Sequence, residues 1–262
     1  MSDLAKLAAA VTVGAALGAA VKSVWGLARI EVISSLIGAP EKPALTLYVY
    51  DHCPFCARAR VILGLKKVPH ELVFMANHDE ATPIGLVGTK QAPILQLPSG
   101  KAFAESMDIV RYVDENYGGP AVLAPASGRE DIKKWIQDSA HVFHVLYHPR
   151  AHAAPFAEFA QLESREYYRI KKEKGMGSFS EALEKSPEYV AEANKFLEEL
   201  APMFRSSHSV NKTLSYDDID LFGRLRSLTL VRDIKWPSNL REFVDHLSEA
   251  GDIQLLDNMA VY

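Results

Sequence analysis

Cysteine is scarce in this sequence, because only Cys53 and Cys56 occur among its 262 residues. With no cysteine left for structural bridges, the composition argues against a secreted disulfide scaffold and favours a reducing compartment such as the cytoplasm. A structural zinc site usually takes four ligands from two cysteine pairs, and the second pair is absent. A redox-active pair is therefore favoured over half of a zinc site and over two structural thiols, and we expect no metal.

Positive charge is not in excess either. The chain has 29 lysines and arginines against 33 aspartates and glutamates, a formal net charge of −4. Nucleic-acid binders usually show a basic excess or stripe, so we expect no nucleic-acid partner and look instead to proteins and small molecules. The length and the 48% hydrophobic content are enough for one large or two ordinary domains with real cores.

A long, strongly hydrophobic run is also missing, although residues 1–44 differ from the rest. Residues 7–21 carry no charge but are rich in alanine, and they are shorter than the roughly 20 apolar residues that span a bilayer. Gly14 and Gly18 have the spacing of a small-residue helix contact. The sequence leaves three readings open: a membrane anchor or interfacial helix, a cleaved or organellar targeting segment, and an appended soluble helix.

What the sequence does contain is one reactive motif between a strand and a helix. Residues 45–50 are apolar with β-branched and aromatic members, which predicts a buried strand. Pro54 suits the first turn of a helix that continues through residues 57–66. Cys53 is thus expected at a helix start, where free N–H groups and the helix dipole favour the thiolate. Cys56, one turn later, can resolve a mixed disulfide formed at Cys53.

The following residues alternate between strand and helix patterns. The expected elements are a strand at 70–74, a helical connection through 80–86, strands at 92–97 and 102–104, and a helix at 105–113. Such an order predicts a mixed sheet covered by helices, an α/β arrangement.

After about residue 128 no strand pattern appears, and helix signals take over. Ser127 and Glu130 have the spacing of a capping box, as do Ser215 and Asp218. The second half is therefore expected to be all α.

Five segments together resemble one family, the glutaredoxins, and within it the two-domain bacterial glutaredoxin 2 type. They are residues 50–54 (YDHCP), 90–95 (KQAPIL), 105–110 (ESMDIV), 227–231 (SLTLV) and 236–238 (WPS). The resemblance runs from about residue 45 to the end. It implies a thioredoxin-like domain followed by an all-helical domain of the glutathione-transferase type. The boundaries expected are an extension at 1–44, the thioredoxin-like domain at 45–118, a linker at 119–128 and the helical domain at 129–262.

The same resemblance implies roles for six residues. Cys53 is the nucleophile that forms a mixed disulfide with glutathione, and Cys56 is its partner. Ala92 pairs with the tripeptide through its backbone beside Pro93, the family's cis-proline. The γ-glutamyl end would lie at Glu105 and Ser106, which could also be a plain helix cap. The expected activity is glutathione-dependent reduction of protein disulfides and glutathionylated proteins, by a monomer that uses glutathione as its co-substrate.

The chain also departs from the family pattern. Phe55 stands where these motifs often have tyrosine, which keeps an aromatic wall for glutathione but removes a hydroxyl, and the extension at 1–44 goes beyond the compact bacterial form. Three alternatives stay open. The first is a membrane-anchored isomerase resembling prostaglandin E synthase 2; the others are a membrane-inserting protein resembling the intracellular chloride channels and an iron–sulfur carrier.

Two weaker patterns lie in the helical half. His141, His144 and His148 would share one helix face, which favours a solvated or cleft-facing helix over a metal site. The stretch 165–174 is locally basic but interleaved with glutamates, which favours a solvated helix face over an anion site.

Overall fold

The computed structural model describes residues 45–260. The predictions made for residues 1–44 lie outside this range. Among the described residues, no helix combines the length and the apolar character needed to cross a bilayer.

The first half is built on a small mixed sheet. Its strands are β1 (Leu45–Val49), β2 (His70–Phe74), β3 (Ile94–Gln96) and β4 (Ala102–Phe103), in the spatial order β2-β1-β3-β4. β2 runs parallel to β1, whereas β3 is antiparallel to both β1 and β4. Leu47 and Val49 of β1 are fully buried, as the apolar pattern predicted.

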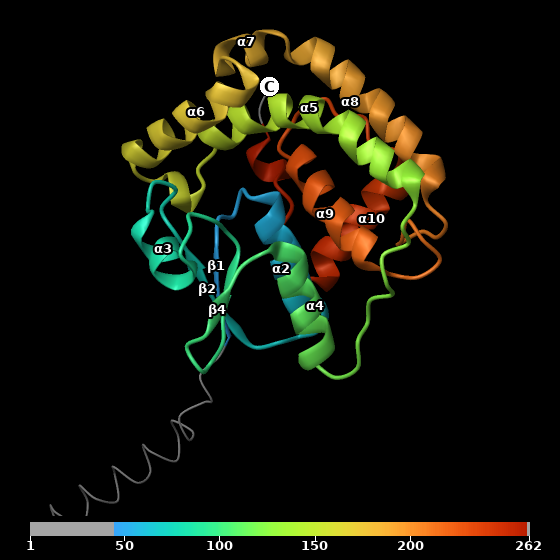
Figure 1. Ribbon diagram of the computed structural model, residues 1–262. Helices are drawn as coiled ribbons and strands as arrows, with labels where there is room; N and C mark the ends of the chain where they lie inside the picture. Colours follow the sequence, from blue (N-terminus) through green and yellow to red (C-terminus); the bar gives the residue numbers. More distant parts are fainter. Residues whose placement is uncertain (1–44, 261–262) are drawn as a thin grey trace, which may run out of the picture. The chain divides into compact units, whose positions relative to one another are not determined.

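Three helices accompany the sheet: α2 (Pro54–Leu65), α3 (Ala81–Val87) and α4 (Ser106–Asn116). α2 and α4 cover one face, and α3 lies on the other (Figure 1). The predicted elements are all present, but the strand expected at 92–97 is shorter. It begins only at Ile94, because Pro93 has no N–H for a ladder hydrogen bond.

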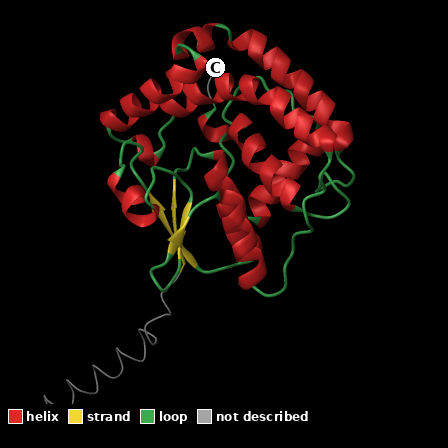
Figure 2. Cartoon of the chain, in the orientation of Figure 1, coloured by secondary structure: helices red, strands yellow, loops and turns green. Residues whose placement is uncertain are grey.

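The second half is entirely helical, as Figure 2 shows. Its elements are α5 (Glu130–Ala153), η1 (Ala157–Phe159), α6 (Leu162–Met176), α7 (Phe179–Glu184), α8 (Ser186–Leu200), η2 (Ala201–Met203), α9 (Tyr216–Leu228), α10 (Ser238–Ala250) and η3 (Asp257–Met259). The predicted fold class, an α/β thioredoxin-like part followed by an all-α part, is therefore confirmed.

The two predicted capping boxes had different outcomes. Asp218 accepts a hydrogen bond from the backbone N–H of Ser215 at 2.8 Å, and this box is confirmed. The box of Ser127 with Glu130 is wrong. Arg129 occupies the cap position without a side-chain bond, and the Ser127 hydroxyl donates to Asp217 instead.

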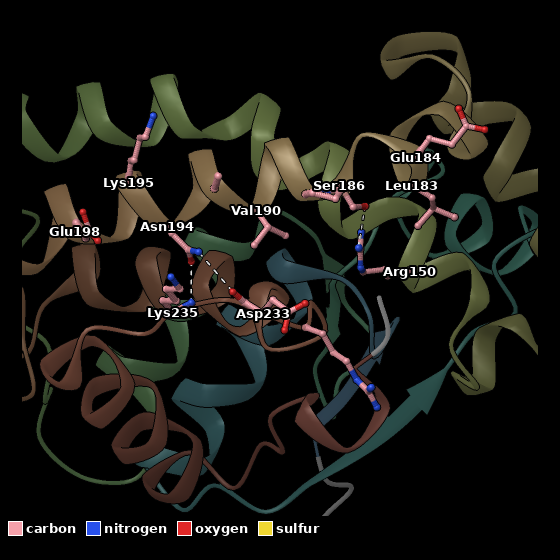
Figure 3. A pocket seen from close by; sticks show the side chains of 13 residues that line it. Arg150, Leu183, Glu184, Ser186, Val190, Asn194, Lys195, Glu198, Asp233 and Lys235 are labelled. Carbon is pink, nitrogen blue, oxygen red and sulfur yellow. Dashed lines mark hydrogen bonds between the residues drawn. The ribbon is translucent and has the colours of Figure 1, made fainter.

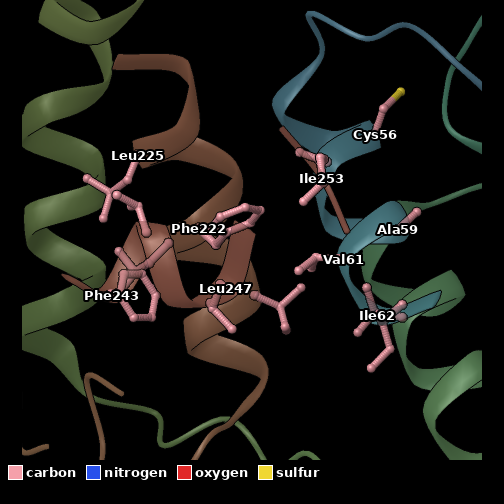
Figure 4. Close-up of a cluster of buried hydrophobic side chains, with 14 of the residues drawn as sticks. Cys56, Ala59, Val61, Ile62, Phe222, Leu225, Phe243, Leu247 and Ile253 are labelled. Carbon is pink, nitrogen blue, oxygen red and sulfur yellow. The ribbon is translucent and has the colours of Figure 1, made fainter. Parts of the chain in front are cut away.

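One hydrophobic core joins the two halves. Figure 4 shows Val61 and Ile62 of α2 near Phe222 of α9 and Leu247 of α10, all of them fully buried. The approach of α9 to α2 requires glycine at position 223. A Cβ on Gly223 would lie 2.4 Å from the Pro54 carbonyl oxygen, well inside contact distance. The helix that follows the cysteine motif is thus packed directly on the helical half.

Candidate active site

Cys53 caps the N-terminus of α2, as its place before Pro54 predicted. Its backbone is extended (φ −75°, ψ 123°), and Pro54 is the first helical residue. Cys53 is half-buried, whereas Cys56 is completely buried and accepts a hydrogen bond from the Tyr50 N–H at 3.4 Å. Both thiols are free. The accessible sulfur is thus the one at the helix start.

The two thiols have pKa values that are driven apart. A hydrogen bond from Cys56 is the largest influence lowering the pKa of Cys53, which falls from an ordinary 9.0 to about 6. Burial of Cys53 opposes this shift, while the charge of His52 and backbone N–H groups at the helix start assist it. Burial raises the pKa of Cys56 well above 9.0, and Cys53 raises it further. At neutral pH, Cys53 is therefore the thiolate and Cys56 the thiol.

The loop before Cys53 is held by residues of the helical half. Arg226 on α9 donates to the Asp51 carbonyl oxygen at 2.8 Å and to its carboxylate at 2.9 Å. The Tyr147 hydroxyl of α5 donates to the carbonyl oxygen of His52. Because these donors come from two packed helices, the loop has little freedom to move away from α2.

A third contact is a buried pair between His52 and Glu158 of η1. The His52 Nδ1 atom lies 2.6 Å from Glu158 Oε1, which also accepts the His52 backbone N–H at 2.9 Å. The imidazole is surrounded by rings, with the centroids of Phe159 and Tyr168 at 4.9 and 5.1 Å. Glu158 was not predicted from the sequence, since it lies 106 residues from His52 and nothing local marks it.

Ala92 and Pro93 lie at the same end of the sheet as the cysteine motif. Tyr48 of β1 pairs with Ile94 of β3 in the antiparallel ladder, so the residues before β3 stand opposite those after β1. Pro93 is buried, Ala92 is half-buried, and the peptide bond between them is cis, as the resemblance implied. The backbone of Ala92 and Pro93 thus lies beside the motif.

Glu105 and Ser106 form the start of α4, which packs on α2. Glu105 is exposed and has a positive φ of 72°. Ser106 is buried, and its hydroxyl accepts a hydrogen bond from Arg58 Nη1 at 3.3 Å. The Arg58 guanidinium also lies over the exposed Phe55 ring, 4.6 Å from its centroid. One arginine of α2 therefore contacts two of the residues expected to bind glutathione.

The predicted histidine face proves to be cleft-facing. His141, His144 and His148 line a cavity of about 410 Å³ that also reaches Cys53. The stretch 165–174 was expected to be a solvated face. Lys171 is exposed, as expected, and Lys172 is half-buried, but both also line the same cavity. Among residues 45–260, no group of three or more potential metal-ligating side chains is placed to hold an ion.

A larger cavity of about 730 Å³ lies away from the cysteines, between α5, α7, α8 and residues 232–235 (Figure 3). Several of its polar groups bond to one another. Arg150 Nη2 donates to the Ser186 hydroxyl at 2.9 Å, and the Lys235 N–H donates to Asn194 Oδ1 at 2.7 Å. These bonds join elements of the helical half, so we assign this cavity no chemistry.

The fold and the site define a class of protein: a glutathione-transferase-like fold with a thioredoxin-type dithiol at a helix start. Two family models match, "Glutathione S-transferase, N-terminal domain" at residues 47–121 and "Glutaredoxin 2, C terminal domain" at residues 131–260. Glutaredoxin 2 of Escherichia coli K12 is 39% identical over 217 residues, which are 83% of this chain and all of the relative. The chain belongs to the glutaredoxin 2 family, which confirms the resemblance, and is an enzyme of the glutathione-dependent oxidoreductase class.

Solved structures agree with this result. Glutaredoxin 2 of Salmonella typhimurium in complex with glutathione superposes with a TM-score of 0.80 at 39% identity, covering 83% of this chain and 99% of that one. Glutathione transferase Omega 3C of Trametes versicolor has a TM-score of 0.51 at 18% identity, covering 83% and 86%. The second likeness concerns the fold alone.

Proposed function

We propose that this chain reduces protein disulfides and protein–glutathione mixed disulfides through Cys53 and Cys56, with glutathione as the reductant. The observation that carries the proposal is the division of the two thiols. Cys53 is half-buried at the start of α2 with a pKa of about 6, whereas Cys56 is buried beside it with a raised pKa. An accessible thiolate next to a buried thiol is the arrangement that thiol–disulfide exchange uses.

For a glutathionylated protein, the Cys53 thiolate attacks the glutathione sulfur. The bond to the protein sulfur breaks, the protein leaves as a thiolate and takes a proton, and a Cys53–glutathione disulfide remains. The thiolate of a second glutathione then attacks the glutathione sulfur, which releases oxidised glutathione and restores the Cys53 thiolate. Each exchange breaks one disulfide and forms one, so electrons balance.

For an internal protein disulfide, the Cys53 thiolate attacks one sulfur and frees the other as a thiol. Cys56 then loses its proton and attacks Cys53, which releases the reduced protein and leaves a Cys53–Cys56 disulfide. Two glutathione molecules reduce this disulfide in two further exchanges. The route needs both cysteines.

Glutathione is proposed to bind at Ala92, Pro93, Phe55, Glu105 and Ser106. Support comes from the free backbone before β3, at the sheet end that carries Cys53, and from the N–H groups at the start of α4. The Glu105 carboxylate would face the γ-glutamyl amine, and the N–H groups its carboxylate. The glutathione complex of the Salmonella relative adds support.

The test is reduction of a glutathionylated peptide, with glutathione and a coupled glutathione reductase, by the native enzyme and by Cys53→Ser. We expect the native enzyme to turn over and the variant to have no activity above the uncatalysed rate. Turnover by Cys53→Ser would overturn the assignment. Thermal unfolding of both proteins checks that the variant is folded.

A further inference from the structure

The cavity beside Cys53 has an unusual charge. The cavity has a volume of about 410 Å³, and its lining residues lie at the start of α2 and on α5, α6 and α9. Four of them are cations, namely Arg58, Lys171, Lys172 and Arg224, and none of the described lining residues is Asp or Glu. Its size is within the range of ordinary ligand sites.

Two of these cations are compensated and two are not. Asp220, next to the cavity on α9, forms ion pairs with both Arg58 and Arg224. Its Oδ1 atom lies 3.2 Å from Arg224 Nε. Lys171 and Lys172 form no ion pair with any described residue. Their Nζ atoms lie over tyrosine rings, at 5.7 and 5.5 Å from the centroids. The lysines therefore supply a positive potential that no described carboxylate neutralises through an ion pair.

Two histidines of α5 that line the cavity, His144 and His148, do not add to this charge at neutral pH. Burial, assisted by the charge of Lys172, lowers the pKa of His144, and it lowers that of His148 well below 6.5. His148 Nδ1 lies 2.7 Å from the Tyr168 hydroxyl, within hydrogen-bond distance. His144 and His148 thus offer neutral hydrogen-bonding groups.

The cavity adjoins the expected glutathione site at Phe55, which lines it, but does not include the other residues of that site. Ala92, Pro93, Glu105 and Ser106 do not line it, whereas Cys53 does. When Cys53 attacks a mixed disulfide, glutathione and the substrate cysteine must extend from the reacting sulfurs to different sides. The cavity is therefore available to the substrate side.

We propose that this cavity binds the segment of the protein substrate around its disulfide or glutathionylated cysteine, and that it selects segments with acidic side chains. The inference rests on the proposed function and adds a substrate class to it. Carboxylates beside the reacting cysteine come within reach of Lys171 and Lys172, while lysines in the same places are repelled.

Three synthetic peptides test the inference. Each carries one glutathionylated cysteine, flanked on both sides by Glu, by Gln or by Lys, and kcat/KM is measured for each at low ionic strength. We expect the native enzyme to prefer the Glu peptide over the Lys peptide by roughly tenfold, with the preference shrinking as salt is added. In Lys171→Gln/Lys172→Gln the ratio should fall to about one.

A matched control comes from the same helix. Lys174 is exposed on α6 and does not line the cavity, so Lys174→Gln should keep the native ratio. A charge reversal, Lys171→Glu/Lys172→Glu, should move the preference to the Lys peptide. Thermal unfolding of each variant checks folding.

The outcomes separate this inference from the proposed function. Equal turnover of all three peptides overturns the acidic preference and leaves the proposed function standing. A preference for the Glu peptide that survives removal of both lysines also overturns it. Turnover of none of the peptides by the native enzyme defeats the proposed function itself.

Discussion

Glu158 of the helical half accepts two hydrogen bonds from His52, the residue directly before Cys53, through a single carboxylate oxygen. The oxygen lies 2.6 Å from His52 Nδ1 and 2.9 Å from the His52 backbone nitrogen, and both side chains are buried. Oε1 accepts the His52 backbone N–H, and a proton on His52 Nδ1 completes the second hydrogen bond. The pair sets both the position of the loop and the charge beside the thiolate.

Glu158→Gln should raise the pKa of Cys53. Glutamine keeps an acceptor oxygen for the His52 N–H but removes the negative charge beside the imidazole, and the charge of His52 lowers the pKa of Cys53. We expect slower alkylation of Cys53 at pH 6–7, measured with iodoacetamide in a Cys56→Ser background. Glu163→Gln, at an exposed position of α6, is the control. An unchanged alkylation midpoint would show that Glu158 has no electrostatic role.

Removing the Glu158 side chain beyond Cβ should destabilise the fold. Glu158→Ala leaves the buried His52 N–H and imidazole without their acceptor, and breaking a buried pair on one side costs about 3–5 kcal/mol in free energy of unfolding. Denaturant unfolding measures the loss. A loss comparable to that of Glu163→Ala would contradict the structural role.

The reactivity of Cys53 should follow its low pKa. Deprotonation produces the reactive thiolate, so the alkylation rate should rise with pH through a midpoint of about 6 and level off above it. An ordinary thiol with a pKa of 9.0 would keep gaining reactivity through pH 9. Rates between pH 4 and 10, with mass spectrometry to locate the label, provide the measurement. A midpoint above pH 8 would contradict the expected thiolate.

Two substitutions of Cys56 should separate its roles. Both Cys56→Ser and Cys56→Ala remove the resolving thiol, so both should lose reduction of an internal disulfide and keep reduction of a glutathionylated peptide. Only serine retains a hydrogen-bond donor towards Cys53, and that bond is the largest influence on the Cys53 pKa. The alkylation midpoint should therefore rise in Cys56→Ala and stay near the native value in Cys56→Ser. Equal midpoints would mean that the bond has no such influence.

Gly223→Ala should destabilise the protein although alanine is the better helix former. The added Cβ would lie 2.4 Å from the Pro54 carbonyl oxygen and 3.0 Å from Arg58 Cγ, so α9 and the start of α2 must separate. Propensity favours alanine by about 1 kcal/mol, and overpacking should reverse this into a net loss of roughly 1–3 kcal/mol. Thermal unfolding gives the sign. Gly85→Ala on α3 should be neutral or stabilising, because an added Cβ there would have no contacting atom within 4 Å.

The local part of the site was predictable from the sequence. A strand followed by Cys53, Pro54 and a run of helix formers determines by itself that the first cysteine caps a helix and the second lies a turn inside it. These relations depend on neighbours a few residues apart, where propensity and capping act. The capping box of Ser215 and Asp218 was predictable for the same reason.

Tertiary structure decided what surrounds the thiols. Ser127 has the right spacing to pair with Glu130. Its hydroxyl instead donates a hydrogen bond to Asp217, 90 residues away, so the predicted capping box does not form. The partners of the loop are equally distant, since Glu158 lies 106 residues from His52 and Arg226 lies 175 from Asp51. No periodicity or spacing marks such pairs, because they form only when the packing of α5, η1 and α9 brings them together.

By itself, then, the sequence determined a reactive dithiol at a helix start within an α/β part joined to an all-α part. The charge beside that dithiol came from the fold. Lys171 and Lys172 belong to a helix whose alternating charges are typical of a solvated face, and only the packing of α6 on α5 places these two lysines in the wall of the cavity that reaches Cys53. The chemistry of Cys53 and Cys56 depends on residues close to them in the sequence, whereas the electrostatic field around them depends on contacts between distant segments.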